Sequence, residues 1–302
     1  MQAYSLPGPR ALQRVRERLV AWCLLLAGLS SVAITAGIVG ILGYESLMFF
    51  RQVTPMEFFT DTQWTPLFAD AHYGILPLVT GTLVTTGIAL ALALPLGTTI
   101  AVYLSEYGPQ AVRETMKPLL ELLSGVPTVV YGYFALLFVT PLLQRIWPAL
   151  PGFNMLSAGL VIGMMIIPYI SSISEDAMRA VPVHLREGSY ALGATRLQTA
   201  LRVIIPSAFS GIAAAYVLGI SRAIGETMIV AIAAGMQPTL TLNPLEPAAT
   251  ITAYIAQVSL GDLPHGSIGY QTIFAAGLVL MLMTLVFNIA GHLLRKRFRQ
   301  AY

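Results

Sequence analysis

Long apolar stretches alternate with short charged segments along this chain, and each stretch is long enough to cross a lipid bilayer. A helix of about 20 apolar residues spans a hydrocarbon layer of about 30 Å. The predicted transmembrane helices are residues 19–43, 74–104, 122–144, 155–174, 206–235 and 268–294. The pattern therefore predicts an all-α integral membrane protein, with an N-terminal segment 1–18, a transmembrane domain 19–294 and a C-terminal tail 295–302.

Two of these spans contain residues that interrupt a helix. Residues 122–144 begin with Ser-Gly-Val-Pro at 124–127, which favours either a broken helix end facing protein or water, or a simple kink. We expect Pro77, Pro95 and Gly97 to bend or break the span 74–104 at either end. Between these two spans, residues 105–121 can form a short amphipathic helix on the inner surface.

Basic residues orient the predicted spans. Fourteen of the 17 Lys and Arg residues lie in the terminal segments and in the loops 105–121 and 175–202, whereas Arg51 and Arg145 lie on the opposite face and Arg222 lies inside a span. Because basic residues concentrate on the cytoplasmic side, both termini are predicted to be cytoplasmic. The net charge of +3 reflects this asymmetry and does not indicate nucleic-acid binding.

The segments 44–73 and 236–265 are then predicted to lie outside. The first carries mainly acidic charges and many aromatic side chains, which are typical of anchors at the membrane interface. The second is rich in Pro and Thr.

Composition supports a membrane protein, since 56% of the residues are hydrophobic and 10% are charged, compared with about 25% charged in soluble domains. The one cysteine, Cys23, lies in the first span, which excludes an internal disulfide and a thiolate metal cluster; we expect it to serve in packing. The four histidines form no helical pair of metal ligands, so no metal site is expected.

Arg222 and Glu226 lie within the predicted span 206–235, where a charge is costly and usually functional. Four residues apart on a helix, they would share a face and could touch across one turn. Arg222 could bind the oxygens of an anion while Glu226 accepts a hydrogen bond or holds the arginine. Alternatively, the two form a permanent ion pair that locks the helix to its neighbours. Ser221 and Thr227 are weaker candidates, because such hydroxyls often bond to their own backbone.

The loop before this span has the spacing of the EAA loop of ABC importer permeases. That loop contains a Glu, two small residues, a Gly six positions after the Glu, and a later apolar pair ending in Pro; here the first four are Glu187, Gly188, Ser189 and Gly193. Gly193 permits a sharp turn between two short helices, and Thr195 can cap the second. The loop could act as a rigid lever seated in a soluble partner, or it could be an ordinary connection.

Nearly the whole chain resembles the phosphate-specific ABC importer permeases, in particular the PstC-type subunit. The matching strings are residues 74–82, 124–132, 189–195 and 222–228, and the last favours PstC-type over PstA-type permeases. The resemblance implies a type I ABC importer permease fold with six transmembrane helices and a cytoplasmic coupling helix. It also implies that Arg222 and Glu226 take part in phosphate translocation, and that Glu187, Gly188, Ser189 and Gly193 couple the chain to an ATPase.

The resemblance further implies an assembly in the inner membrane of a prokaryote. Its other parts are a PstA-type permease subunit, a pair of ATP-binding subunits inside and a periplasmic or surface-tethered phosphate-binding protein outside. The chain has no G-x-x-x-x-G-K-[ST] motif, so it is not itself the ATPase; ATP and Mg²⁺ are expected on the partner and no cofactor on this chain.

Several alternatives to phosphate import stay open. Sulfate, molybdate and phosphonate permeases use the same loop, and only the resemblance selects phosphate. A proton-coupled secondary transporter could use Glu226 as its proton carrier. An intramembrane enzyme is disfavoured, since no constellation of nucleophile and base is present.

Overall fold

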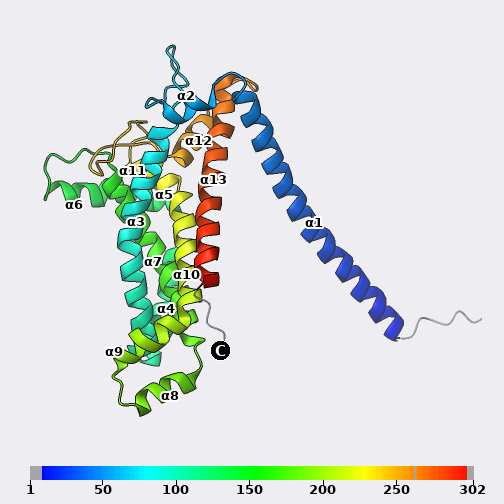
Figure 1. The fold of residues 1–302 in the computed structure, drawn as a ribbon, viewed down its shortest axis with the longest axis vertical. Helices are drawn as coiled ribbons and strands as arrows, with labels where there is room; N and C mark the ends of the chain where they lie inside the picture. The colour runs from blue at the N-terminus through cyan, green and yellow to red at the C-terminus, as the bar shows by residue number, and fades with distance from the viewer. Residues whose placement is uncertain (1–8, 262, 298–302) are drawn as a thin grey trace, which may run out of the picture.

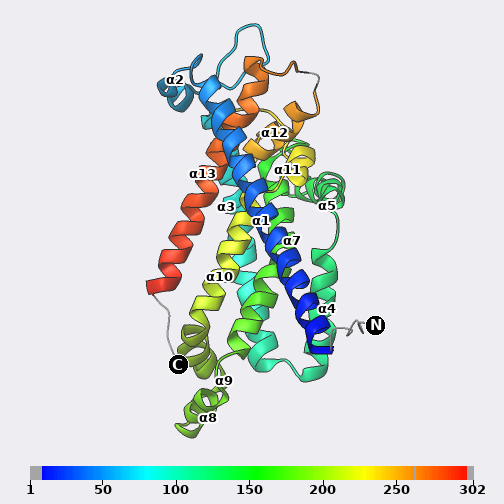
Figure 2. The same cartoon turned by 90° about the vertical axis from the view of Figure 1, so that its right-hand side faces the viewer.

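The computed structural model describes residues 9–261 and 263–297, and this part of the chain is helical apart from loops and two isolated β-bridges. The long helices are α1 (Pro9–Phe49), α3 (Leu76–Val102), α7 (Met155–Arg179), α10 (Ile205–Ile224) and α13 (Ile268–Arg297) (Figures 1 and 2). Five helical segments of the described residues are long and apolar enough to cross a membrane, and a bent pair of shorter helices brings the number to six.

Helix α7 packs between α3 and α10 at the centre of the bundle. The backbones come close because glycines stand at the crossings: a Cβ on Gly163 would lie 2.8 Å from the carbonyl oxygen of Ala89. Small residues allow this close packing in lipid, where the hydrophobic effect does not drive helices together. Asn154 starts α7 by accepting a hydrogen bond from the amide of Ser157 at 2.7 Å.

Of the two predicted outcomes at Pro95 and Gly97, a break is wrong, because α3 continues through both residues and is followed by the π-helix η1 (Tyr103–Tyr107). A single proline removes one backbone hydrogen bond, which membrane helices tolerate when neighbouring groups compensate.

The third predicted span is divided by a sharp break. Helix α4 (Gln110–Ser124) and the helical run α5 (Thr128–Phe134), η2 (Ala135–Val139) and α6 (Thr140–Gln144) meet at 89°. The predicted helix start at residue 122 is therefore wrong, since residues 122–124 complete α4. The break follows from Pro127, which lacks an amide hydrogen and disfavours helical geometry at the preceding residue.

The two segments predicted to lie outside carry two short helices, α2 (Pro55–Thr60) and α12 (Ile251–Ser259), at one end of the bundle. Phe49, Phe58 and Trp64 are almost fully buried there, and the Trp64 ring packs edge-on against Tyr254 of α12. The prediction that these three aromatic side chains anchor the chain in the membrane interface is therefore wrong. They form a small core instead.

Helix α1 leans away from the bundle (Figure 1), and the side chains of residues 13–41 are exposed. Only its C-terminal part touches the rest of the chain, as where Leu42 approaches Gly277 of α13. Cys23 is exposed, so the expectation that it packs is wrong within this chain. The predicted terminal segments are partly helical, because residues 9–18 belong to α1 and 295–297 to α13; residues 1–8 and 298–302 lie outside the described part.

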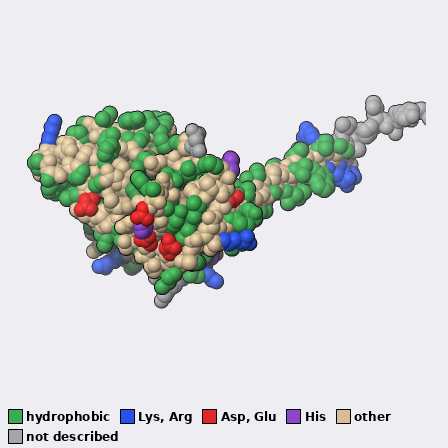
Figure 3. Space-filling view, turned by 90° about the horizontal axis from the view of Figure 1, so that it is seen from above, with side chains coloured by type: hydrophobic (Ala, Val, Ile, Leu, Met, Phe, Trp, Pro, Cys, Tyr) green, Lys and Arg blue, Asp and Glu red, His purple; other side chains and the backbone are tan. Residues whose placement is uncertain are grey.

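The opposite end of the bundle carries α8 (Val183–Ala191), α9 (Arg196–Thr199) and the π-helix η3 (Ala200–Ile204). The first described residues of α1 and the last of α13 point toward this end (Figure 1). On the other end, seen from above in Figure 3, Asp and Glu side chains gather near the middle with a histidine, and Lys and Arg lie at the edges.

Candidate functional site

The predicted span 206–235 is not one helix. Helix α10 ends at Ile224, and the six-residue helix α11 (Met228–Ala233) begins after the break Gly225–Thr227. The expectation of a continuous helix to Gly235, with Arg222 and Glu226 one turn apart on one face, is therefore wrong. Gly225 disfavours continuation of the helix, because glycine loses more conformational freedom on folding than other residues do. Arg222 therefore lies in the last turn of α10.

Arg222 does not form an ion pair with Glu226 in the described structure. Its guanidinium carbon instead lies 4.6 Å from the centre of the Tyr169 ring, which is a cation–π contact. The Nε atom of Arg222 is buried and has no hydrogen-bond partner among the described residues. The Nε–H group of Arg222 is therefore free to donate to an anion, and such a bond would remove the cost of leaving a buried donor unpaired.

Glu226 has a different set of neighbours. Its side chain is 7% exposed, and Oε1 accepts a hydrogen bond from the amide of Ile229 at 3.3 Å. Its own carbonyl oxygen accepts from the Thr252 hydroxyl at 2.7 Å. Glu226 therefore stabilises the first turn of α11 and fastens the break to α12.

Tyr169 connects this break to the one between α4 and α5. Its hydroxyl donates to the carbonyl oxygen of Ser124 at 3.2 Å while its ring faces Arg222. The short helices that follow the two breaks also touch, because a Cβ on Gly132 of α5 would lie 2.8 Å from Ile232 of α11. Two interrupted helices thus meet beside Arg222. Irregular backbone within a membrane is tolerated only where it packs against protein or lines a water-filled path.

The weaker candidates differ. Thr227 donates to the carbonyl oxygen of Gly225 at 3.3 Å, as expected for a hydroxyl that bonds to its own backbone. The Ser221 hydroxyl is buried and makes no such bond among the described residues.

The predicted coupling loop folds as two short helices joined by a glycine turn. Gly193 has φ +83°, and the amides of Gly193 and Ala194 donate to the carbonyl oxygens of Tyr190 (2.9 Å) and Ser189 (3.2 Å). This pair of bonds is the Schellman motif, which ends a helix with a left-handed glycine. Thr195 then caps α9 in a capping box with Gln198, which confirms the predicted turn and cap.

Within this loop, Glu187 and Gly188 are exposed, and Ser189 donates or accepts a hydrogen bond with Thr199 at 2.9 Å. The coupling role of Glu187, Gly188, Ser189 and Gly193 stays a prediction. Leu192 is 90% exposed at the tip, so the loop presents an apolar side chain to whatever lies beyond it.

Arg186, which the sequence analysis did not single out, fastens this loop to the bundle. Its guanidinium lies 3.1 Å from Glu106 of η1 and donates to the carbonyl oxygens of Met178 and Val181, each at 2.7 Å. Arg186 and Glu106 are 17% and 4% exposed, so this is a nearly buried pair. No sequence signal identifies it, because the partners are 80 residues apart.

A second ionic contact joins α4 to α7. The Lys117 ammonium lies 3.0 Å from Glu175, which is 2% exposed, and also contacts Asp176. Helix α4 is therefore the amphipathic helix expected in this segment, and it also packs against α7.

Comparison with known proteins places the chain in a family. The family described as "Binding-protein-dependent transport system inner membrane component" matches residues 93–300. A "Probable ABC transporter permease protein YqgH" of Bacillus subtilis (strain 168) is 37% identical over 95% of this chain and 93% of its own length. A "Phosphate transport system permease protein PstC" of Xylella fastidiosa (strain 9a5c) is 32% identical over 97% of this chain and 95% of its own.

Solved structures agree at the level of the fold. A chain of a bacterial ABC transporter involved in the import of the acidic polysaccharide alginate gives a TM-score of 0.66 at 18% identity, covering 96% of this chain and 100% of that one. A chain of the MetNI methionine ABC transporter, in an inward-facing conformation, gives 0.54 at 17% identity, covering 75% and 95%. Since the family match covers well over half of its residues, this chain belongs to the binding-protein-dependent transport system inner membrane components, and it is a multi-pass ABC importer permease subunit whose ATPase is a separate chain.

Proposed function

We propose that this chain is the PstC-type permease subunit of a phosphate importer and that Arg222 binds phosphate on its path through the membrane. The observation that carries this proposal is the buried Nε of Arg222, which has no hydrogen-bond partner among the described residues and lies beside two helix breaks. A guanidinium offers a planar set of N–H donors that suits the oxygens of phosphate. The 32% identity to a PstC protein supports phosphate as the anion.

Glu226 serves this site by holding the break in place. Its side-chain bond to Ile229 and its carbonyl bond with Thr252 fix the chain directly after Arg222. In this proposal Arg222 leaves the Tyr169 ring and takes up phosphate oxygens when the path opens. Cation–π contacts of this kind are weak enough, at about 0.5–2 kcal/mol, to be exchanged for an anion.

The exposed loop α8–α9 supports a coupling role for Glu187, Gly188, Ser189 and Gly193. In the proposed assembly it docks on one of two ATP-binding subunits in the cytoplasm, which places both termini on the same side. The uncovered apolar surface of α1 suits a PstA-type permease subunit or lipid. The end of the bundle seen in Figure 3, with Asp and Glu side chains near its middle, then points outward, toward a phosphate-binding protein.

A second candidate is a permease for another oxyanion such as sulfate, molybdate or phosphonate. The printed name of the YqgH relative gives no substrate, and the guanidinium alone does not select phosphate. Membership of the ABC importer family argues against a proton-coupled secondary transporter.

The test is uptake by the complete complex in proteoliposomes, with ATP on the ATPase side and the native binding protein on the other. Phosphate, sulfate, molybdate and a phosphonate are offered separately as labelled substrates. We expect ATP-dependent uptake of phosphate above the other three. Preferred uptake of another oxyanion overturns the phosphate assignment and leaves the family unchanged, whereas uptake without ATP overturns the ABC mechanism.

A further inference from the structure

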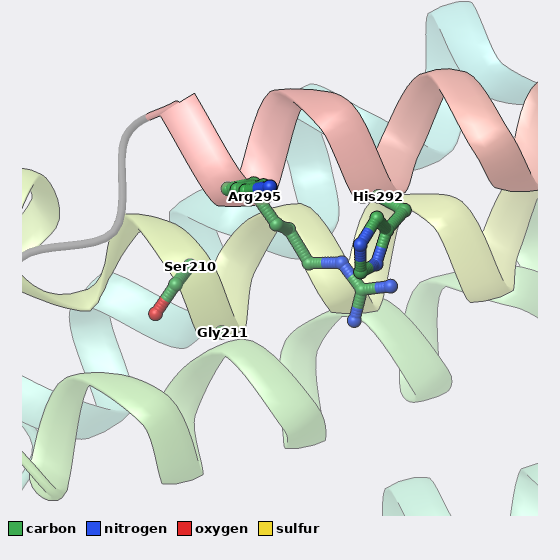
Figure 4. A pocket seen from close by; sticks show the side chains of 5 residues that line it. Ser210, Gly211, His292 and Arg295 are labelled. Atoms are coloured by element: carbon green, nitrogen blue, oxygen red, sulfur yellow. The ribbon is translucent and has the colours of Figure 1, made fainter.

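Helices α10 and α13 part near the end of the bundle that carries α8 and α9, and leave a hollow of about 540 Å³ (Figure 4). Among the described residues it is lined by Ser210, Gly211, His292, Arg295 and Lys296. The hollow is far along α10 from Arg222, so it is separate from the proposed phosphate path. Neither the motifs in the sequence nor the matched family names account for it.

The hollow follows from the residues at the helix crossing. Gly291 of α13 lies so close to Val217 of α10 that a Cβ there would overlap the valine side chain. Farther along, α10 offers only the small Ser210 and Gly211, and Gly211 itself packs against Ala177 of α7. The two helices therefore touch at Gly291 and leave space beside Arg295.

This space carries positive charge without compensation. No carboxylate of the described residues forms an ion pair with His292, Arg295 or Lys296. The Nε of Arg295 is buried and has no hydrogen-bond partner there. Figure 4 shows the Arg295 side chain reaching across the gap, with its guanidinium beside the His292 ring. Such a set of donors is complementary to a phosphate oxyanion.

An apolar stripe leads along α13 into the same place. Leu285 and Ile289 are 49% and 50% exposed, and the spacing of 4, 3 and 4 residues puts them on one helix face with His292 and Lys296. A free phosphate ion has no apolar part that could contact this stripe. A phospholipid does, because its acyl chain can lie on the apolar residues while its phosphate meets the basic ones.

We propose that the hollow between α10 and α13 binds the phosphate group of an anionic phospholipid, with an acyl chain along Leu285 and Ile289. The position fits, because His292 to Lys296 follow directly on the apolar part of a membrane-spanning helix, at the level of lipid headgroups. Basic pockets between membrane helices are known places for anionic headgroups. The bound lipid would fasten the end of α13 to α10.

The test uses the complete complex, purified in mild detergent and analysed by native mass spectrometry with added phosphatidylglycerol or phosphatidylcholine. We expect selective retention of phosphatidylglycerol. The double variant Arg295→Gln/Lys296→Gln should bind it about 30-fold more weakly, the factor that two basic residues contribute at an anionic lipid surface. The matched control is Arg16→Gln/Arg18→Gln, which removes two exposed cations from α1 at the same end of the bundle.

Three outcomes overturn the proposal. Equal losses in the α1 control would mean that general surface charge holds the lipid. Displacement of phosphatidylglycerol by millimolar inorganic phosphate would identify a free-anion site. Unchanged retention in the double variant would mean that the lipid binds elsewhere. A melting curve of each variant shows whether the complex is folded, and Arg295→Lys/Lys296→Arg, which keeps both charges, should restore retention.

Discussion

Arg222 and Glu226 make different contacts in the described structure, although their spacing had suggested one shared contact. The embedded charges could be identified from the sequence, because a charge in a long apolar run stands out at once. Their partners could not, since Tyr169 and Thr252 reach the site from α7 and α12. The sequence left two interpretations open, anion binding and a permanent ion pair. The described structure contains no such pair, which favours anion binding.

Substitution of Arg222 by lysine tests the anion-binding reading. Lysine keeps the positive charge but loses the planar fork, so at least one charged hydrogen bond to phosphate should be lost. We expect assembly to be normal and phosphate uptake to fall by about 10- to 100-fold, on the order of 1.5–3 kcal/mol. Arg145→Lys, in the loop after α6, is the control and should have no effect. Normal uptake by Arg222→Lys would remove Arg222 from the path.

His72 and Asp61 form a pH-dependent contact in the segment between α2 and α3, with Nδ1 and Oδ2 2.9 Å apart. The hydrogen bond to Asp61 raises the pKa of His72 above its ordinary value. Burial acts to raise the pKa of Asp61, but hydrogen bonds from Gln63 and His72 outweigh it and lower that pKa. The stabilisation by His72 is thus fully present below its unfolded pKa and is lost as pH rises through its higher folded pKa. The Asp61 contribution is lost as pH falls through its lowered pKa.

Hydrogen exchange of residues 61–74 should therefore be slowest between these two limits and should accelerate as pH rises past the folded pKa of His72, which lies above the ordinary value of about 6.5. The rates are first corrected for the intrinsic effect of pH on exchange. His72→Gln, which cannot titrate, should abolish the upper transition. Persistence of that transition in the variant would assign it to another group.

At the level of elements, the coupling loop shows which features short-range sequence can specify. The turn at Gly193 and the cap at Thr195 depend on neighbours within six residues, and both were predicted correctly. The attachment of the loop by Arg186 depends on Glu106 and on the end of α7, and spacing along the chain cannot predict it.

Two glycines of the loop should respond in opposite ways to alanine. Gly193→Ala places a side chain at φ +83° and should destabilise the turn by about 1–2 kcal/mol, although no atom lies within 4 Å of the added Cβ. Gly188→Ala has equal space but lies inside α8, where alanine should stabilise the helix by about 1 kcal/mol. Co-purification of the ATPase subunit should weaken for Gly193→Ala and persist for Gly188→Ala, because alanine keeps the small side chain that the coupling loop requires at position 188. Equal behaviour of the two variants would argue against a coupling role of the turn.

Arg186 should position the loop as well as stabilise it. Arg186→Gln leaves the buried Glu106 carboxylate without its cation, although the Ser105 hydroxyl still donates to it, which costs about 3–5 kcal/mol and lowers the melting temperature. The double variant Arg186→Met/Glu106→Leu removes both charges and should recover most of that stability. The readout is the amount of phosphate transported per ATP hydrolysed. If Arg186 positions α8, this ratio stays low in the double variant. Full recovery of the ratio would mean that Arg186 only stabilises the protein. Arg196→Gln, an exposed arginine on α9, is the control.

For the whole molecule, the length of each apolar run predicted the membrane crossings, because the bilayer fixes that length. The breaks at 125–127 and 225–227 were harder to place, since proline and glycine also occur inside continuous helices, as Pro95 of α3 shows. The buried aromatic cluster was missed for a related reason. Phe49, Phe58 and Trp64 look like interfacial anchors until α12 covers them.

The orientation of the whole bundle is the remaining prediction, and it rests on the asymmetry of basic residues. If the α8–α9 end is cytoplasmic, cysteines at the exposed positions 63 and 242, before α3 and before α12, should react with an impermeant thiol reagent in intact cells whose outer barrier is opened. A cysteine at the exposed Gln198 of α9 should react only after the membrane is permeabilised. All three are made in a Cys23→Ala background, because Cys23 is exposed on α1 and would otherwise contribute signal. Labelling of position 198 alone in intact cells would invert the topology, and with it the proposed sides of the ATPase and the binding protein.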